Sequence, residues 1–361
     1  MRKNLVAILA GVSIILAAAA YFTTDSAESS ASALLLRRPP QIRPRIDASA
    51  EVRGMALGLH AGSDNYDYEP ALAEIRELGA NSVELVIAWY QADVRSSEPR
   101  SVKGRTPSLR RIARTIETAR GMGLRVHLLP IVLLESAGDR EWRGVMEPED
   151  PDAWWRNYES LLKDLARVAD EKGAESLSVG SELLWSERER ARWQKVIAGV
   201  RSEYRGKLIY SANWDHYDVV EFWDLLDQVG ISGYFELTHD SEATRTDLEL
   251  SWMKVRQDLL DWLPESKPLL FTEIGCPAVD GGAVYPWNYT MQTTRDDEEQ
   301  ARALAAFFEA WKKTPGFSGA FVYEWDLPGT EATNYSPKGR EGEEVVKRWL
   351  RGHSPTLQHS E

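Results

Sequence analysis

The sequence contains one cysteine, Cys276, among 361 residues, so no disulfide bond can form within the chain. Cys276 directly follows an apolar run, a position from which a thiol nucleophile could act. However, no histidine lies near it in the sequence to activate the thiol, and free cysteine is commonly a small buried apolar residue. We therefore expect Cys276 to pack rather than to react.

The chain also lacks the patterns of metal and nucleic-acid sites. The six histidines are scattered, without HxH, HExxH or CxxC spacings. The formal net charge of −13 leaves no basic excess for a nucleic-acid groove. No GxGxxG or Walker-type loop follows the first expected strand, which removes the main support for a nucleotide-binding sheet. We therefore expect no metal, no cofactor and no nucleic-acid partner.

Apolar residues make up 43% of the chain, which is enough for a full core, and tryptophan is abundant at 14 residues. We expect most of these tryptophans to be buried. The remainder could serve as stacking platforms, because an aromatic face matches the apolar C–H face of a sugar ring.

The first fifty residues differ in composition from the rest. Arg2 and Lys3 precede an apolar stretch over 5–22, so we interpret residues 1–22 as a signal peptide or membrane anchor. Residues 23–50 are rich in Ser, Ala, Pro and Arg and read as a flexible linker. We expect an exported, extracytoplasmic protein that is periplasmic, secreted or tethered through 5–22 to the outer face of the inner membrane.

Residues 51–352 alternate short apolar runs with longer amphipathic stretches, and 353–361 form a C-terminal tail. The expected strands are 55–60, 82–89, 125–133, 175–182, 207–213, 229–234, 268–274 and 317–325. Each is followed by an expected helix, which is short over 219–226. Strands that alternate with helices imply a parallel sheet, and eight units favour closure. The predicted fold is therefore a single α/β domain, a (β/α)₈ TIM barrel.

Two of the expected strands end in a glutamate. The run 269–271 leads to Glu273, and the run 177–179 leads to Glu182. Active sites of (β/α)₈ enzymes lie at the C-terminal ends of the strands, and a buried carboxylate is costly unless it is used or paired. Two such carboxylates suggest cleavage of a glycosidic bond by an acid and a nucleophile, with the acid in apolar surroundings that raise its pKa.

Other expected strand ends carry polar or aromatic side chains that could line the same site. They are His60, Trp89, Asn213, Tyr234 and Trp325. Each of four also has a structural interpretation: His60 as a packed core histidine, Trp89 and Trp325 as core residues, and Asn213 as a turn cap.

Several stretches carry a family resemblance. They are Trp89-Tyr-Gln91, Gly180-Ser-Glu-Leu183, Tyr210-Ser-Ala-Asn-Trp-Asp215, Phe271-Thr-Glu-Ile-Gly275 and Tyr285-Pro-Trp287. In their order and spacing the chain resembles glycoside hydrolase family 113, whose characterised members include β-1,4-mannanases, over about residues 53–350. That family belongs to a superfamily of retaining (β/α)₈ glycosidases.

The resemblance implies an endo-β-1,4-mannanase or related enzyme on β-linked polysaccharide, working by double displacement with Glu182 as acid/base and Glu273 as nucleophile. It implies that Tyr234 bonds the nucleophile and that Trp325 lies under the sugar. Trp89, Asn213, Trp214 and Trp287 would be further substrate contacts, and His60 is a further candidate. Ser181 stands where much of the superfamily has asparagine, and its shorter hydroxyl would change the contact to a sugar 2-OH.

Two other interpretations remain open at this point. The first is a carbohydrate-binding or cell-envelope protein on the same barrel with weak or no hydrolysis, since a fold does not guarantee activity. The second is a metal-dependent hydrolase, for which only His60 and His127 are available near strand ends. Sugar, linkage and oligomeric state are not indicated by the sequence.

Overall fold

The computed structural model describes residues 47, 49–138, 140–264, 267–328 and 333–353. The expected signal or anchor at 1–22 and nearly all of the expected linker and tail lie outside these residues. Within the described part of the chain, no helix is long and apolar enough to cross a membrane.

Eight parallel strands close into one barrel in chain order, and the last strand pairs with the first through Val52 and Gly319. The closed (β/α)₈ architecture predicted from the sequence is confirmed. The strands are β1 (Val52–Gly58), β2 (Ser82–Gln91), β3 (Arg125–Leu134), β4 (Ser176–Ser181), β5 (Lys207–Asn213), β6 (Gln228–Ser232), β7 (Leu269–Ile274) and β8 (Phe317–Val322).

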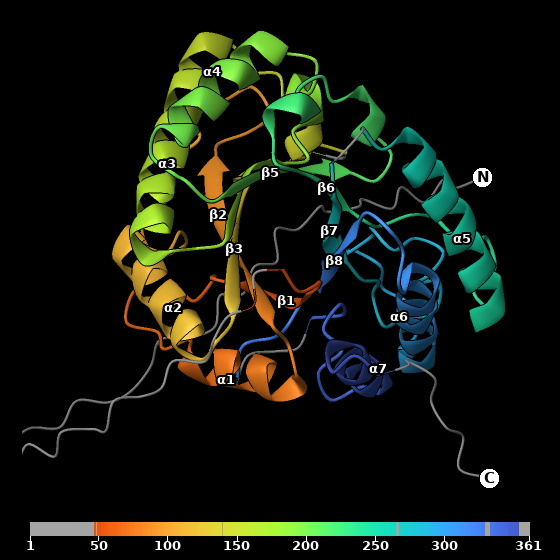
Figure 1. Cartoon of the computed structure of the whole chain (residues 1–361). Coiled ribbons are helices and arrows are strands. Elements are labelled where there is room, and N and C mark those ends of the chain that lie inside the picture. Colours follow the sequence, from red (N-terminus) through yellow and green to blue (C-terminus); the bar gives the residue numbers. More distant parts are fainter. Residues whose placement is uncertain (1–46, 48, 139, 265–266, 329–332, 354–361) are drawn as a thin grey trace, which may run out of the picture.

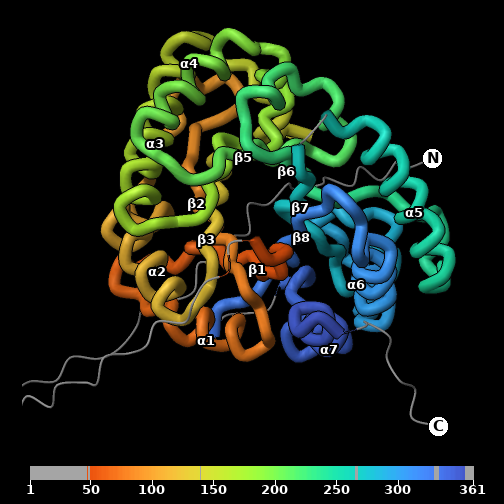
Figure 2. Tube along the Cα trace, in the orientation of Figure 1, coloured from red at the N-terminus to blue at the C-terminus, as the bar shows by residue number. Residues whose placement is uncertain are grey.

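Helices surround this barrel in chain order, as Figure 1 shows, and the tube in Figure 2 follows the same ring. Among the described residues they are α1 (Glu69–Leu78), α2 (Leu109–Gly121), α3 (Pro151–Lys172), α4 (Arg190–Arg201), α5 (Arg245–Trp262), α6 (Asp297–Trp311) and α7 (Glu341–Leu350). Local sequence sets several ends: the Asp150 side chain caps the first turn of α3, and Gly173 ends that helix with a left-handed φ of 71°.

The short helix expected over 219–226 is wrong. Two 3₁₀ turns, η3 (Tyr217–Val219) and η4 (Trp223–Leu225), connect β5 to β6 instead. In both turns an amide bonds the carbonyl three residues earlier, Val219 to His216 at 3.2 Å and Leu225 to Phe222 at 3.0 Å, as in a 3₁₀ helix. Here the Glu221 amide donates to the carbonyl of Glu187, 3.1 Å away, and the Trp223 indole donates to that of Tyr217 at 2.9 Å. These contacts hold the two short turns in place.

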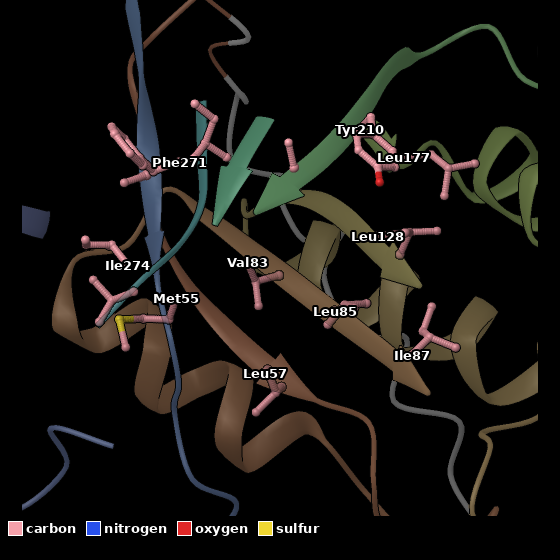
Figure 3. Close-up of a cluster of buried hydrophobic side chains, with 14 of the residues drawn as sticks. Met55, Leu57, Val83, Leu85, Ile87, Leu128, Leu177, Tyr210, Phe271 and Ile274 are labelled. Carbon is pink, nitrogen blue, oxygen red and sulfur yellow. The ribbon is translucent and has the colours of Figure 1, made fainter. Parts of the chain in front are cut away.

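The two faces of the strands serve different cores. Outward-facing side chains such as Leu57, Leu85 and Phe271 pack into one large apolar layer beneath the helices, part of which Figure 3 shows. The barrel interior holds a smaller apolar cluster that includes Val86, Ala88 and Leu129. At the N-terminal ends of the strands, a cavity of about 270 Å³ is lined by residues that include Arg125, His127 and Gln228.

Candidate active site

Glu182 follows the last residue of β4 and has a left-handed φ of 52°. This conformation costs a non-glycine residue roughly 1 kcal/mol. One hydrogen bond on each side of Glu182 holds it in this conformation. The Glu182 amide donates to the Ser211 carbonyl at 2.8 Å, and the Leu183 amide donates to the Tyr210 hydroxyl at 2.9 Å. The strained turn fixes how the Glu182 side chain, which is only 5% exposed, leaves the strand end.

Both carboxylate oxygens of Glu182 have partners. Nη2 of Arg143 donates to Oε2 at 2.5 Å, and the Ser232 hydroxyl contacts Oε1. The same hydroxyl lies 3.1 Å from the Ala212 carbonyl. Because Ser232 has one proton, it can donate to an ionised Glu182, or donate to Ala212 and accept from a protonated Glu182. This contact therefore suits a carboxyl group that gains and loses a proton.

Glu273 is in β7 and is also 5% exposed. The Tyr234 hydroxyl donates to its Oε2 at 2.7 Å, as the resemblance implied. Glu273 and Ser232 are partners in the β6–β7 register, and Ser232 contacts Glu182. The end of β6 thus links the two glutamates from strands that lie far apart in the sequence.

Burial raises the pKa of Glu273 to about 7, and the neighbouring Glu182 carboxylate adds to the effect. Arg143 and Tyr234 act in the opposite direction and favour the ionised form. Burial also disfavours the charge of Arg143, but Glu182 and Glu273 outweigh it and raise the Arg143 pKa. Glu273 is therefore at the edge of ionisation near neutral pH, whereas a nucleophile must be ionised.

The structure places Trp325 differently from the role that the resemblance implied. Its indole N–H donates to Oε2 of Glu74 on α1 at 2.8 Å, and Lys338 lies 5.2 Å from the ring centroid. Tyr323, two residues earlier, contributes to the surroundings of Glu273 instead: the carboxylate of Glu273 is among the groups that raise its pKa, after Glu324 and burial. The aromatic side chain of this segment beside Glu273 is thus Tyr323.

Trp89 does not reach the barrel mouth either. It lies in β2 with Leu85 and Ile87 on the helix-facing side, is 3% exposed, and packs edge-on against Tyr158 of α3 at 5.8 Å. Alternation of side chains along the strand turns its neighbour Tyr90 inward instead. The expectation that Trp89 contacts substrate is corrected to a packing role.

His60 lies two residues beyond the end of β1, and its ring covers Gly58 so closely that a Cβ there would be 2.3 Å from it. Burial lowers the pKa of His60 to about 4, so the imidazole is neutral. Within the described part of the chain it makes no hydrogen bond to Glu182 or Glu273. The side chain is partly exposed, so a contact between His60 and substrate stays a prediction.

The remaining expected contacts lie around the mouth. Nδ2 of Asn213 donates to the Asp215 carboxylate at 2.7 Å, a bond between two side chains, and the centroid of the Trp214 ring lies 5.7 Å from that of Phe235. Trp287 is 45% exposed, with its indole N–H donating to Glu236 at 2.8 Å. Ser181 is 1% exposed, and its hydroxyl has no partner among the described residues. None of these four contacts either glutamate through a hydrogen bond in the described structure.

Sequence reasoning missed Arg143 and Ser232, the two partners of Glu182. Arg143 lies in η1 (Arg143–Val145), in the connection between β3 and α3, and nothing in its sequence neighbours marks it. Ser232 ends β6 two residues before Tyr234, so strand-end position was a usable signal for it. Among the described residues, no group of three or more His, Cys, Asp or Glu side chains is placed to hold a metal ion.

A closed (β/α)₈ barrel with two buried glutamates where β4 and β7 end defines a barrel glycoside hydrolase. Sequence comparison then identifies the family. The chain belongs to Glycoside Hydrolase Family 113, whose profile matches residues 55–338. Comparison with curated proteins finds no match.

Comparison with solved structures agrees with this family assignment. The GH113 beta-mannanase of Alicyclobacillus acidocaldarius, in complex with ManMIm, is 29% identical with a TM-score of 0.73, over 84% of this chain and 98% of that one. A GH113 beta-1,4-mannanase complex is 24% identical with a TM-score of 0.73, over 84% of this chain and 100% of that one. A Faecalibacterium prausnitzii beta-glucuronidase, 13% identical with a TM-score of 0.59 over 84% of this chain and 49% of that one, shares the fold.

Proposed function

We propose that this glycoside hydrolase works with retention of configuration, with Glu273 as nucleophile and Glu182 as acid/base. The observation that carries the proposal is the convergence of two buried glutamates on Arg143 and the end of β6. Glu273 attacks the anomeric carbon while Glu182 protonates the departing glycosidic oxygen. Glu182 then deprotonates the water that hydrolyses the glycosyl–enzyme ester.

We propose β-1,4-mannan or a related β-linked polysaccharide as the substrate, cleaved internally. The 29% identical relative from Alicyclobacillus acidocaldarius, a beta-mannanase, supports the sugar class. Internal cleavage is supported by three exposed aromatic rings on the loop between β7 and α6: Tyr285, Trp287 and Tyr289 are 47%, 45% and 76% exposed. This loop lies beside the site, because Tyr335 bonds the Pro286 carbonyl at 2.6 Å and packs against Tyr234. Such rings can stack on sugars beyond the cleaved bond.

We also propose that the barrel works outside the cytoplasm, exported by residues 1–22 and separated from them by the linker over 23–50. The apolar stretch and the polar, proline-containing segment after it support this arrangement. Fractionation of cells that express the full chain would show the enzyme outside the cytoplasm. Recovery of the intact chain from the cytoplasm would contradict it.

Chemical rescue tests the two roles separately. Glu273→Ala and Glu182→Ala should each lower kcat on oligosaccharide roughly 10³-fold or more while circular dichroism stays unchanged. Added azide should give a glycosyl azide of inverted configuration with Glu273→Ala, because azide attacks the free substrate. It should give the retained configuration with Glu182→Ala, because azide attacks the glycosyl–enzyme. Near-normal hydrolysis by either variant would falsify the assignment.

Product analysis tests the substrate. The protein should release mixed oligosaccharides early from β-mannan and much less from β-glucan or xylan. Binding of these polysaccharides without release of reducing ends would favour the carbohydrate-binding interpretation.

A further inference from the structure

We propose that Tyr210 and Glu187 are positioning residues for the acid/base, acting through the amide of Leu183. This inference rests on the proposed role of Glu182. Neither residue contacts Glu182 by a hydrogen bond in the described structure. Their effect is on the backbone turn that directs its carboxyl group.

A chain of hydrogen bonds joins the turn to a buried carboxyl group. The Tyr210 hydroxyl accepts from the Leu183 amide at 2.9 Å and donates to Oε1 of Glu187 at 2.9 Å. Glu187 is fully buried, and its Oε2 lies 3.2 Å from Nδ1 of His216. These hydrogen bonds thus connect the peptide that follows Glu182 to His216 in the loop after β5.

The Leu183 amide is a controlling point because the peptide between Glu182 and Leu183 sets ψ of Glu182. Glu182 has a φ of 52°, a region that a non-glycine residue occupies only when its surroundings enforce it. The bond from the Glu182 amide to Ser211 fixes one side of the residue, and the bond from the Leu183 amide to Tyr210 fixes the other. Loss of the second bond frees the turn and moves the carboxyl group away from the glycosidic oxygen.

Glu187 defines which way the Tyr210 hydroxyl faces. A phenol has one proton and can donate or accept. While Glu187 takes that proton, the oxygen lone pairs remain for the Leu183 amide. If no acceptor stood at position 187, the hydroxyl could rotate, and the buried Leu183 amide would lose a defined partner.

The rival explanation is that Tyr210 only fills space. Its ring does pack against Trp193 and Phe222, with centroids 5.3 and 5.1 Å away, and Gly180 leaves room for it. Tyr210→Phe keeps that ring and removes only the hydroxyl. Tyr204→Phe is a matched control: Tyr204 is also buried and donates to the Ala174 carbonyl at 2.8 Å, before the start of β4 and so at the opposite end of that strand from Glu182.

Leaving-group dependence separates positioning from packing. A sugar leaving group needs the proton of Glu182, whereas 2,4-dinitrophenolate leaves without one, and kcat/KM reports steps up to the first irreversible cleavage. On an oligosaccharide that the wild type cleaves, Tyr210→Phe should lower kcat/KM by about 100-fold. On the 2,4-dinitrophenyl glycoside of the same sugar, the loss should stay within about 3-fold.

Position 187 gives a second test that leaves Tyr210 in place. Glu187→Leu should reproduce the Tyr210→Phe pattern, and Glu187→Gln, which retains an accepting oxygen, should restore kcat/KM on the oligosaccharide to within about 5-fold of wild type. Tyr204→Phe should leave kcat/KM on both substrates unchanged. If Tyr210→Phe does not fold, Glu187→Leu and Glu187→Gln decide between positioning and packing.

Equal losses on both substrates, or no loss on the oligosaccharide, would overturn the inference and leave the proposed function standing. A wild-type protein that cleaves neither substrate would overturn both.

Discussion

Glu273 is buried beside a second carboxylate, which makes its ionisation costly. The surrounding side chains offset only part of that cost. The Tyr234 hydroxyl and the Arg143 cation favour its ionised form, whereas burial and Glu182 favour the protonated form. A nucleophilic carboxylate has to be ionised, so kcat/KM should fall as the pH drops through about 7. The acid side of the pH profile is thus a direct readout of this residue.

Tyr234→Phe removes a hydrogen bond that lowers the pKa of Glu273. The pKa of the variant should be higher, so its loss of kcat/KM should begin at a higher pH than in the wild type. The maximal kcat should fall about 100-fold, as for removal of one oriented donor. Initial rates from about pH 5 to pH 9 measure both effects. An acid limb that stays in place would show that Tyr234 does not set the ionisation of Glu273.

At the scale of single residues, the sequence predicted part of the site. Glu182, Glu273 and Tyr234 follow apolar strands closely, and their position alone indicated the mouth of the barrel. Arg143 could not be found, because it reaches Glu182 from a loop whose path depends on tertiary packing. Trp325 and Tyr323 are two residues apart after β8, and sequence gives no rule for which ring turns toward Glu273.

At the scale of elements, periodicity predicted strands and long helices well and short connections poorly. The β5–β6 connection forms two 3₁₀ turns, held by the bonds from the Glu221 amide to the Glu187 carbonyl and from the Trp223 indole to the Tyr217 carbonyl. Trp89 was also misplaced. The apolar run over β2 is buried on both faces, so composition does not reveal which alternate residues face the helices.

The aromatic loop between β7 and α6 should contribute to binding of long substrates. Trp287→Ala removes an exposed ring that is held by Glu236. KM for a long oligosaccharide should rise about 5- to 10-fold, with little change in kcat, while a minimal substrate is unaffected. Trp287→Phe, which keeps a stacking face, should recover most of the loss. An equal change in KM for short and long substrates would place Trp287 outside the extended site.

At the scale of the whole molecule, barrel closure buries polar groups that the proposed reaction does not use. Glu84 of β2 is fully buried, and burial, followed by the charge of Glu273, raises its pKa well above its usual value. His127 of β3 lies 3.4 Å away, bonds Ser176, and has a pKa lowered by burial to about 3. Both side chains are therefore neutral in the folded protein near neutral pH.

Glu84 should make the fold less stable as the pH rises. Above the unfolded-state pKa of 4.5, the unfolded chain releases the Glu84 proton while the folded chain retains it. The free energy of unfolding therefore falls by roughly 1 kcal/mol per pH unit until the folded-state pKa is reached. Glu84→Gln removes this loss, and its gain in thermal midpoint over wild type should grow from about pH 5 to pH 8. Glu77→Gln, at an exposed position, serves as the control. A gain that is equal at both pH values would mean that Glu84 is ionised in the folded state.

The closed barrel was predictable because eight strand–helix units repeat along the chain, whereas the pairing of Glu84 with His127 was not. Their contact depends on β2 and β3 meeting in a register that places His127 opposite Glu84. The register of parallel strands is set by packing of the whole barrel and leaves no local mark in the sequence.

The most direct test of the account is to trap the glycosyl–enzyme. Incubation with a 2-deoxy-2-fluoro-β-mannosyl donor bearing an activated leaving group, followed by digestion and mass spectrometry, should find the sugar on Glu273. Glu182 and Cys276 should remain unlabelled, and the Glu273→Ala variant should take up no label. A label on another residue, or hydrolysis of substrate with inverted configuration and no adduct, would contradict the assignment of Glu273 as the nucleophile.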